Sequence, residues 1–507
     1  MFPSLVNFKN RKLAIYKLLI FLIISINPIS FLLAQVQKLD DYYGTSIYFE
    51  SKKLFENKLI REAELRVINI IENFPDNPSY GKAELLKAKI DIISGNYEVS
   101  KSTLERFVEK YPNSPLQSNA LLQIALILVE QQKWEQSLKY FDKALKRIEF
   151  DKRMRSDVNY FAELEGEALF WQGISIYQQG RYFESIPSFK QLITKLPESH
   201  LVDDSYFAIA LVYERNMEYD SAITNYNQII NKYPYSNSVL SSVIRSANNY
   251  LMTRRASRAL FDLETATSIY GHIQANDSIG KLYQPQTYLN YTIDEISYLK
   301  GEAYNIVGNY DQAIAEMTAF LETYSDTKLR SYFLYGIAWN YLNKGKWAEA
   351  ISYYEQLIVE GNADKKILSL AEFYRAVAVA KSGKVEEAQK ELLALASRSD
   401  YPFVGMALLE VAQINYNAEN YNEARKNLIR AEKEANSGRI SARIHLLLGA
   451  TYLQLKNYDA ALFEFDKVAT IVQNSNILMF PEKKLYSSEI LFRRAICYIQ
   501  MNRYKQA

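Results

Sequence analysis

Histidine and cysteine, on which metal sites and many catalytic sites depend, are scarce in this sequence. The three histidines, His200, His272 and His445, lie far apart and outside any H-E-x-x-H motif, so a compact zinc site has no support. We expect all three on the surface. The single cysteine, Cys497, forms neither an intramolecular disulfide nor a thiolate metal cluster. The sequence therefore predicts no metal and no cofactor.

Motifs for nucleotide and ester chemistry are also missing. No G-x-x-x-x-G-K-[ST] loop and no G-x-S-x-G elbow occurs, and Gly345-Lys346 and Gly383-Lys384 fit ordinary turns between helices. Acid–base catalysis by two carboxylates needs a pocket that brings them together. The 58 Asp and Glu residues instead spread along the whole chain, as on a solvated surface. We therefore predict that the protein is not an enzyme.

The overall charge is nearly balanced. Lys and Arg together number 60, which gives a formal net charge of +2. Such a chain has no broad positive field that would attract nucleic acid. We expect no nucleic-acid partner.

The N-terminus has the pattern of a secretory signal peptide. Basic residues up to Lys17 precede an apolar run over residues 18–33, which closes on Ala34. The run contains Pro28 and is shorter than the about 20 apolar residues of a membrane-spanning helix. We predict a cleaved signal peptide over residues 1–34 and an exported protein. An uncleaved segment that anchors the protein in the inner membrane is the alternative.

The elements that would position any site are paired helices. With only 17 Gly and 12 Pro in 507 residues, long helices are favoured over a loop-rich β fold. The clearest unit has Ala210-x2-Tyr213 in one helix, Ala222-x3-Tyr226 in the next, and Pro234 after it. Alanine lets two helices cross closely, and the tyrosines fill the groove between neighbouring hairpins.

A small residue recurs at this crossing position of the second helix, most often every 37 residues. The crossing residues are Ala63, Ser100, Ser137, Ser185, Ala222, Ala259, Ala313, Ala350, Ala388, Ala424, Ala461 and Ala507. Twelve positions in one register predict twelve helix-turn-helix units.

These residues resemble the tetratricopeptide repeat family, whose pattern places Gly-x2-Tyr in the first helix and Ala-x3-Phe in the second. Besides the clearest unit, the resemblance is carried by Gly301, Tyr304, Ala313, Ala338, Tyr341, Ala350, Gly449, Tyr452, Ala461 and Phe465. It covers residues 47–507 and implies an all-α fold, a right-handed superhelical solenoid of about twelve repeats. The 37-residue period and the aromatic-proline unit ends are similar to the bacterial envelope branch, that is, Tol-Pal-associated periplasmic proteins and outer-membrane assembly lipoproteins.

Longer spacings between crossing residues divide the array. We predict a lead-in over 35–46, a first part of six units over 47–272 with one insertion near 149–160, an insertion over 273–293, and a second part over 294–507. A shorter insertion is expected near 473–484. Since no second helix follows Ala507, we expect a chain that is truncated at its end.

The resemblance also implies a binding face, because certain positions of each first helix line the concave side of the superhelix. In the seventh to ninth units these positions hold Tyr298, Tyr332, Tyr335, Trp339, Asn343 and Phe373. We predict that they form an apolar partner-binding groove with an acidic edge from Glu295 and Glu302. The alternative is that the rings only pack against neighbouring helices. The Lys and Asn pattern with which some family members bind a C-terminal carboxylate is missing from these positions.

The sequence as a whole predicts a scaffold or adaptor for protein–protein interactions in the bacterial cell envelope, in the periplasm or at the outer membrane. Its partner would be a protein or peptide of that compartment. Two alternatives stay open. In the first, the chain is the N-terminal sensor or interaction region of a larger enzyme or signalling protein. In the second, it is an inner-membrane-anchored member of a secretion or envelope-assembly machine.

Overall fold

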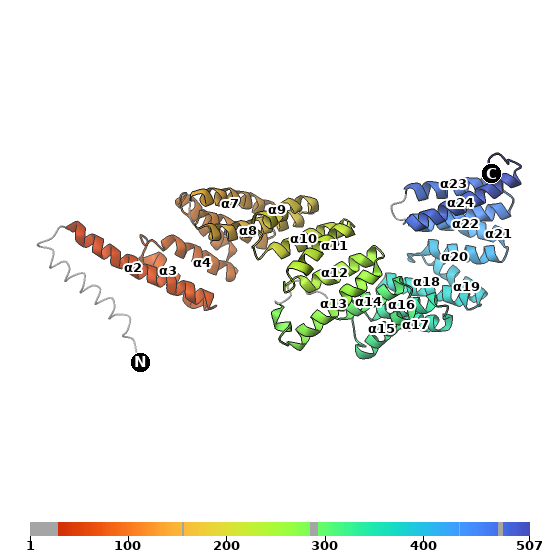
Figure 1. Cartoon of the computed structure of the whole chain (residues 1–507), viewed down its shortest axis with the longest axis horizontal. Helices are drawn as coiled ribbons and strands as arrows, with labels where there is room; N and C mark the ends of the chain where they lie inside the picture. The colour runs from red at the N-terminus through yellow and green to blue at the C-terminus, as the bar shows by residue number, and fades with distance from the viewer. Residues whose placement is uncertain (1–28, 155–156, 284–292, 436, 475–479) are drawn as a thin grey trace. The chain divides into compact units, whose positions relative to one another are not determined.

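The computed structural model describes residues 29–154, 157–283, 293–435, 437–474 and 480–507 (Figure 1). For residues 29–40, 158 and 480–483 it describes the backbone alone. Over these ranges every regular element is helical, with 23 α-helices and one short 3-10 helix. The predicted signal peptide lies outside the described residues except for 29–34, which begin the first described helix.

The chain divides into two compact units, which are described separately. The first ends at Ser238 and contains α2 (Ile29–Glu56), α3 (Ile60–Asn73), α4 (Tyr80–Ile93), α5 (Tyr97–Lys110), α6 (Gln117–Glu130), α7 (Trp134–Met154), α8 (Val158–Gln178), α9 (Tyr182–Lys195), α10 (Val202–Arg215) and α11 (Tyr219–Lys232).

The second compact unit begins at Val239. It contains α12 (Val239–Met252), α13 (Ala256–Ala275), η1 (Gly280–Leu282), α14 (Ile293–Ile306), α15 (Tyr310–Thr323), α16 (Arg330–Asn343), α17 (Trp347–Glu360), α18 (Lys365–Lys381), α19 (Val385–Ser397), α20 (Val404–Asn417), α21 (Tyr421–Lys433), α22 (Gly438–Gln454), α23 (Tyr458–Asn474) and α24 (Phe480–Gln500). The predicted division at 273–293 lies within this unit.

Within each unit the helices form a stack of hairpins. Each even-numbered helix up to α22 packs against the odd-numbered helix that follows it, and first helices of successive hairpins also touch, as α4 touches α6 and α14 touches α16. The all-α repeat architecture predicted from the sequence is thereby confirmed.

First and second helices differ in how much of their surface is buried. The second helix α3 is amphipathic, with Ala63, Val67 and Ile70 buried along one stripe at helical spacing. The first helix α6 is buried nearly all round, because α4, α5, α7 and α8 all pack against it.

The crossing residues lie where the helices of each hairpin approach. Eleven of them, from Ala63 to Ala461, have a relative solvent exposure of 0%. Because helix axes separated by only about 8 Å leave room for a small side chain alone, Ala and Ser are the residues that fit there.

The turn inside each hairpin uses a left-handed backbone conformation. With φ between 56° and 96°, one such residue lies five positions before every crossing residue: Lys58, Gly95, Gln132, Gly180, Met217, Arg254, Gly308, Gly345, Gly383, Glu419, Lys456 and Asn502. Only five of the twelve are glycine, the residue that adopts this conformation without strain. The last, Asn502, places Ala507 in the same register as the other crossing residues.

The predicted insertion near 149–160 is largely helix extension. Both α7 and α8 have 21 residues, whereas most helices of the array have 14. In the 273–293 insertion, α13 runs on to Ala275 and η1 follows, while residues 284–292 lie outside the described part. Residues 475–479 of the 473–484 insertion lie outside it as well.

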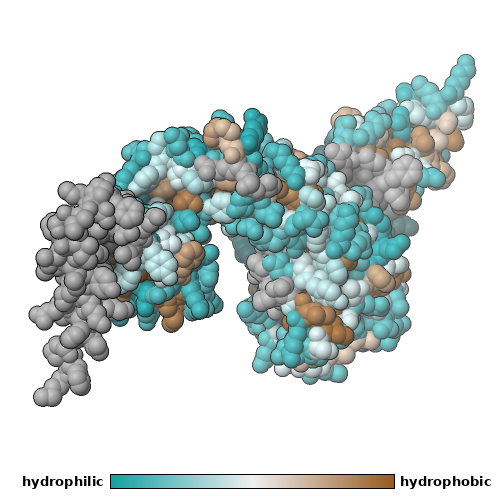
Figure 2. Space-filling view, turned by 60° about the vertical axis from the view of Figure 1, so that its left-hand side comes forward, coloured by the Kyte–Doolittle hydropathy of each residue, from teal (hydrophilic) through white to brown (hydrophobic). Residues whose placement is uncertain are grey.

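The face drawn in Figure 2 is mostly hydrophilic, and its hydrophobic residues form small separate patches. Singly exposed apolar residues of this kind are normal on a protein surface, so they do not by themselves mark a binding site. None of the described helices combines the length and apolar character needed to cross a membrane.

Candidate partner-binding site

Four of the five aromatic residues predicted to bind a partner lie on α14 and α16 of the second unit. Tyr298 and Tyr332 meet edge to face, with ring centroids 6.0 Å apart. Trp339 meets Tyr374 of α18 at 4.8 Å, and Tyr335 meets the same ring at 6.3 Å. All five side chains are half-buried. Each ring therefore packs on a neighbouring helix and still keeps part of its surface exposed.

Two of the predicted residues stand apart from this row. Phe373 is only 3% exposed and packs in the core of the second unit with Leu392 and Tyr401. A partner has no access to that ring, so it belongs to the hydrophobic core and not to a binding face. Asn343, the last residue of α16, is exposed.

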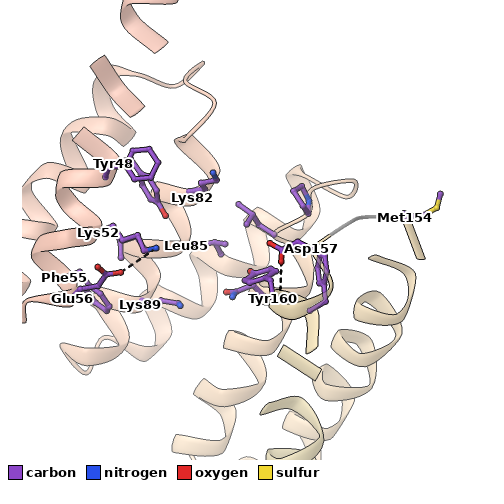
Figure 3. Close-up of a pocket in the computed structure, with 16 residues that line it drawn as sticks. Tyr48, Lys52, Phe55, Glu56, Lys82, Leu85, Lys89, Met154, Asp157 and Tyr160 are labelled. Carbon is purple, nitrogen blue, oxygen red and sulfur yellow. Dashed lines mark hydrogen bonds and ion pairs between the residues drawn. The ribbon is translucent and has the colours of Figure 1, made fainter. Parts of the chain in front are cut away.

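The first unit contains a larger feature that was not predicted from the sequence. It is a cavity of about 970 Å³, which we call the Tyr48 cavity (Figure 3). The residues that line it are Tyr48, Phe49, Lys52, Phe55, Glu56, Lys82, Leu85, Leu86, Lys89, Pro115, Leu116, Asn119, Met154, Asp157, Tyr160 and Phe161. Most belong to α2, α4, α6 and α8, the first helices of four successive hairpins. The volume is typical of a ligand-binding pocket.

Of the three lysines in the Tyr48 cavity, one forms an ion pair with a described residue and two do not. Lys52 forms an ion pair with Glu56, with Nζ and Oε1 3.6 Å apart (Figure 3). Over the described ranges, no carboxylate lies within 4.0 Å of the ammonium groups of Lys82 and Lys89, which project from α4 one on either side of Leu85. Asp157 is occupied as the N-cap of α8, since its Oδ1 accepts a hydrogen bond from the backbone N–H of Tyr160 at 3.3 Å.

One polar atom of the cavity has no partner within the described structure. Asn119 is 8% exposed, and its Oδ1 is buried without a hydrogen bond. A buried amide oxygen without a donor costs free energy, so this atom is ready to accept a hydrogen bond from a bound molecule or from water. Burial also raises the pKa of the Tyr48 hydroxyl, with a smaller contribution from Glu56.

The cavity residues occupy the same repeat positions as the predicted aromatic residues of the second unit. Tyr48 and Leu85 each lie fifteen residues before a crossing residue, as Tyr335 does; Lys52 and Lys89 share the position of Trp339. Counting back from Ala63 and Ser100 would therefore have identified them. The cavity residues were missed because the prediction searched for aromatic residues at these positions in successive units. In the first unit two of the positions hold lysine instead.

The structure places the three histidines in different surroundings. His200 is exposed, and His272 contacts Asp277 with its Nδ1 2.7 Å from Oδ2. The expectation that His445 lies on the surface is wrong: it is 5% exposed, and its Nδ1 lies 2.6 Å from Oε2 of Glu464. The carboxylate partner satisfies the ring on a buried helix face, which the sequence spacing does not reveal.

The His445 contact is part of a small ionic network between α21, α22 and α23. Lys467 Nζ lies 3.2 Å from Glu432 Oε1 and 3.3 Å from Glu464 Oε1. Burial alone would lower the pKa of Lys467, but its hydrogen bonds and charge interactions with the two glutamates outweigh burial and raise it. Lysine and two carboxylates that satisfy one another in this way hold helices together, so we assign the network to structure.

No group of three or more His, Cys, Asp or Glu side chains suited to holding a metal ion occurs among the described residues. Cys497, the only cysteine, is buried.

The hairpins, their crossing residues and their turns define a helical-repeat protein. Family models of tetratricopeptide repeats match much of the chain: a tetratricopeptide repeat-like domain over residues 33–182, and two further tetratricopeptide repeat models over 298–365 with 409–475, and over 167–199 with 204–236. The chain is a tetratricopeptide repeat protein. Such proteins are generally non-enzymatic scaffolds that bind protein partners.

Several solved structures are similar to this chain at low sequence identity. Yeast Tom70 is 15% identical over 91% of this chain and 97% of its own, with a TM-score of 0.42. A tetratricopeptide repeat protein from Parabacteroides merdae ATCC 43184 is 14% identical over 65% and 98%, with a TM-score of 0.39. In the APC/C hetero-tetramer Cut9-Hcn1, the matched chain is 13% identical over 90% of each chain, with a TM-score of 0.34. No curated protein sequence matches this chain.

Proposed function

We propose that this chain is an exported scaffold of the bacterial cell envelope that binds an extended segment of a protein partner in the Tyr48 cavity. The observation that carries the binding role is the position of this cavity on the first helices of four successive hairpins. A surface assembled from consecutive repeats suits a ligand that runs along several of them.

The cavity offers a peptide three kinds of contact. Tyr48, Phe49 and Phe55 supply apolar surface for its side chains. Lys82 and Lys89 supply positive charge without a carboxylate neighbour within ion-pair distance, and the buried Oδ1 of Asn119 accepts a hydrogen bond from a backbone N–H. Apolar anchors with a few well-placed polar groups are the usual composition of a specific binding pocket.

Cross-linking should locate the partner in the cavity. The photoreactive amino acid p-benzoylphenylalanine is placed at Tyr48, and the protein is irradiated in intact cells. We expect a covalent adduct with one predominant protein, since a bound segment lies within reach of the cavity wall. The adduct is identified by mass spectrometry of the cross-linked band.

The matched control carries the same amino acid at Leu65 of α3, which is 64% exposed and does not line the cavity. Adducts of equal yield and identity from Tyr48 and Leu65 would show that capture is not specific to the cavity. A Lys82→Glu and Lys89→Glu double variant should lower the Tyr48 yield, because it reverses both of these positive charges.

Export is supported by the basic and apolar pattern of the N-terminus. We expect the protein in the periplasmic or outer-membrane fraction, with a mature N-terminus that follows Ala34. Mass spectrometry of the intact purified protein measures this directly. An N-terminus before Leu18 in a membrane fraction would favour the anchored alternative, and protein confined to the cytosol would contradict export.

A further inference from the structure

Glu302 on α14 carries a carboxylate that the fold has left without a partner. Within the part of the chain that the structure describes, it has no hydrogen bond and no ion pair, although its side chain is half-buried. On the same helix the carboxylate of Asp294 does have a partner, because its Oδ2 accepts a hydrogen bond from the Thr327 hydroxyl at 2.5 Å. Burial raises the pKa of Glu302. An unpaired, partly desolvated charge lowers the stability of the fold, so we look for a role of Glu302 in binding.

The carboxylate lies against the next first helix at its smallest residue. A Cβ built at Gly336 of α16 would lie 4.0 Å from Oε1 of Glu302 and 2.8 Å from Sδ of Met317. Gly336 is itself buried, and its lack of a side chain lets Met317 pack beside the carboxylate.

Aromatic rings surround this position from two helices. Tyr298 is one helical turn before Glu302 on α14, and Tyr335 and Trp339 flank Gly336 on α16. Burial raises the pKa of both tyrosine hydroxyls, and the Glu302 charge contributes in each case, which places the carboxylate near both. We call Glu302, Gly336 and these three rings the Glu302 site.

Two arginines of the following first helices are already engaged with other carboxylates. Arg375 of α18 contacts Glu355 and Glu391 at 3.2 and 3.1 Å. Arg443 of α22 contacts Glu410 at 3.1 Å. Among the described residues no cation pairs with Glu302, so the Glu302 site has a carboxylate and aromatic faces but no cation of its own.

We propose that the Glu302 site binds an arginine side chain of a protein partner, with the guanidinium paired to Glu302 and stacked on the rings of Tyr335 and Trp339. A cation is required to balance a desolvated carboxylate. Aromatic faces attract cations, and the flat, weakly hydrated guanidinium stacks on them better than an ammonium group. A single carboxylate supplies too few oxygen ligands for a Ca²⁺ or Mg²⁺ ion. This site lies in the second compact unit, so it is independent of the Tyr48 cavity.

The test uses the full chain labelled with 5-fluorotryptophan and observed by ¹⁹F NMR. The chain has four tryptophans, and a Trp339→Phe variant assigns the Trp339 resonance. The probe is Nα-acetyl-arginine amide, with the uncharged, nearly isosteric citrulline amide and the lysine amide as comparisons. We expect a saturable shift of the Trp339 resonance with the arginine probe, at least tenfold weaker binding of the lysine probe, and no shift with citrulline.

Glu302→Gln should weaken binding of the arginine probe at least tenfold and raise the melting temperature, because it removes the unpaired charge while keeping the shape. The rise in melting temperature also shows that the variant is folded. Glu322→Gln, which neutralises an exposed carboxylate on α15, should leave the Trp339 shift unchanged. An equal response to arginine and citrulline, equal binding of lysine, or full binding by folded Glu302→Gln would overturn the proposal.

Discussion

Replacing Gly449 with alanine is expected to lower the free energy of unfolding of the second compact unit by about 1–3 kcal/mol through overpacking. A Cβ at this position of α22 would lie 2.5 Å from Cε1 and 2.8 Å from Cδ1 of Phe465. The ring is 0% exposed and packs with Ala461 and Val468, so it cannot move aside. Alanine is favoured over glycine in a helix by about 1 kcal/mol, and the clash outweighs that gain.

The matched control is Gly271→Ala in α13, another glycine inside a helix of the second unit. No heavy atom lies within 4 Å of a Cβ built there, so only the helix preference acts and stability should rise by up to about 1 kcal/mol. Urea unfolding followed by circular dichroism gives the size of each change. Amide hydrogen exchange in α22 shows whether the loss from Gly449→Ala is local. Changes of the same sign in the two variants would contradict the steric explanation.

The Gly449–Phe465 contact shows why so much of the fold could be predicted. Repeat packing depends on single residues at fixed spacing: a small residue at each crossing position and a ring opposite a glycine. Both requirements are visible in the sequence because they concern residue size alone. The 37-residue register is therefore sufficient by itself to identify the hairpins.

The turns show where prediction stopped. Twelve turns adopt a left-handed conformation. In some of them the left-handed residue is not glycine but a residue such as Met217, Arg254 or Lys456. For such residues the conformation costs roughly 1–2 kcal/mol and is imposed by the two helices that pack on either side of the turn. The sequence around these turns therefore carries no local signal of their geometry.

The candidate sites were only partly predictable for a similar reason. Repeat position indicates that Tyr335 and Phe373 face the same way, but Tyr401 and its neighbours cover Phe373 and leave it in the core. Whether a side chain at this position is exposed depends on the bulk of the next hairpin. Likewise, the sequence shows many carboxylates, and only the structure shows that Glu302 has no cationic partner among the described residues.

Asp204 of α10 has an environment comparable to that of Glu302, and it should make the first unit more stable at mildly acid pH. Burial, and to a lesser extent the charge of Asp203, raises the pKa of Asp204 from 3.8 to about 7. Its Oδ1 is buried without a hydrogen bond in the described structure. Asp204 lies in the first turn of α10, where the helix dipole normally stabilises a carboxylate by about 0.3–1 kcal/mol and so lowers its pKa. Since the pKa of Asp204 is raised instead, the effect of burial is larger than that of the dipole.

The sign of the pH effect follows from the two pKa values. Above about pH 7 the carboxylate is charged in both the folded and the unfolded chain, and the folded state bears the full cost of burying it. As the pH falls from 8 to 5, the folded chain binds a proton that the unfolded chain does not, and stability rises. Below 3.8 both states are protonated, and the gain is constant.

Asp204→Asn should therefore stabilise the first unit at pH 8 by about 2 kcal/mol, and by at most about 4 kcal/mol, the free-energy equivalent of that change in pKa. Most of this advantage should disappear at pH 5, where wild-type Asp204 is already neutral in the folded state. Urea unfolding of both proteins at pH 5, 6, 7 and 8 measures the difference. Asp203→Asn removes a charge that raises the pKa of Asp204, so it should shift the rise in stability to lower pH. A constant difference between wild type and Asp204→Asn across this range would mean that Asp204 does not titrate there. The cost of its burial would then arise from packing and not from charge.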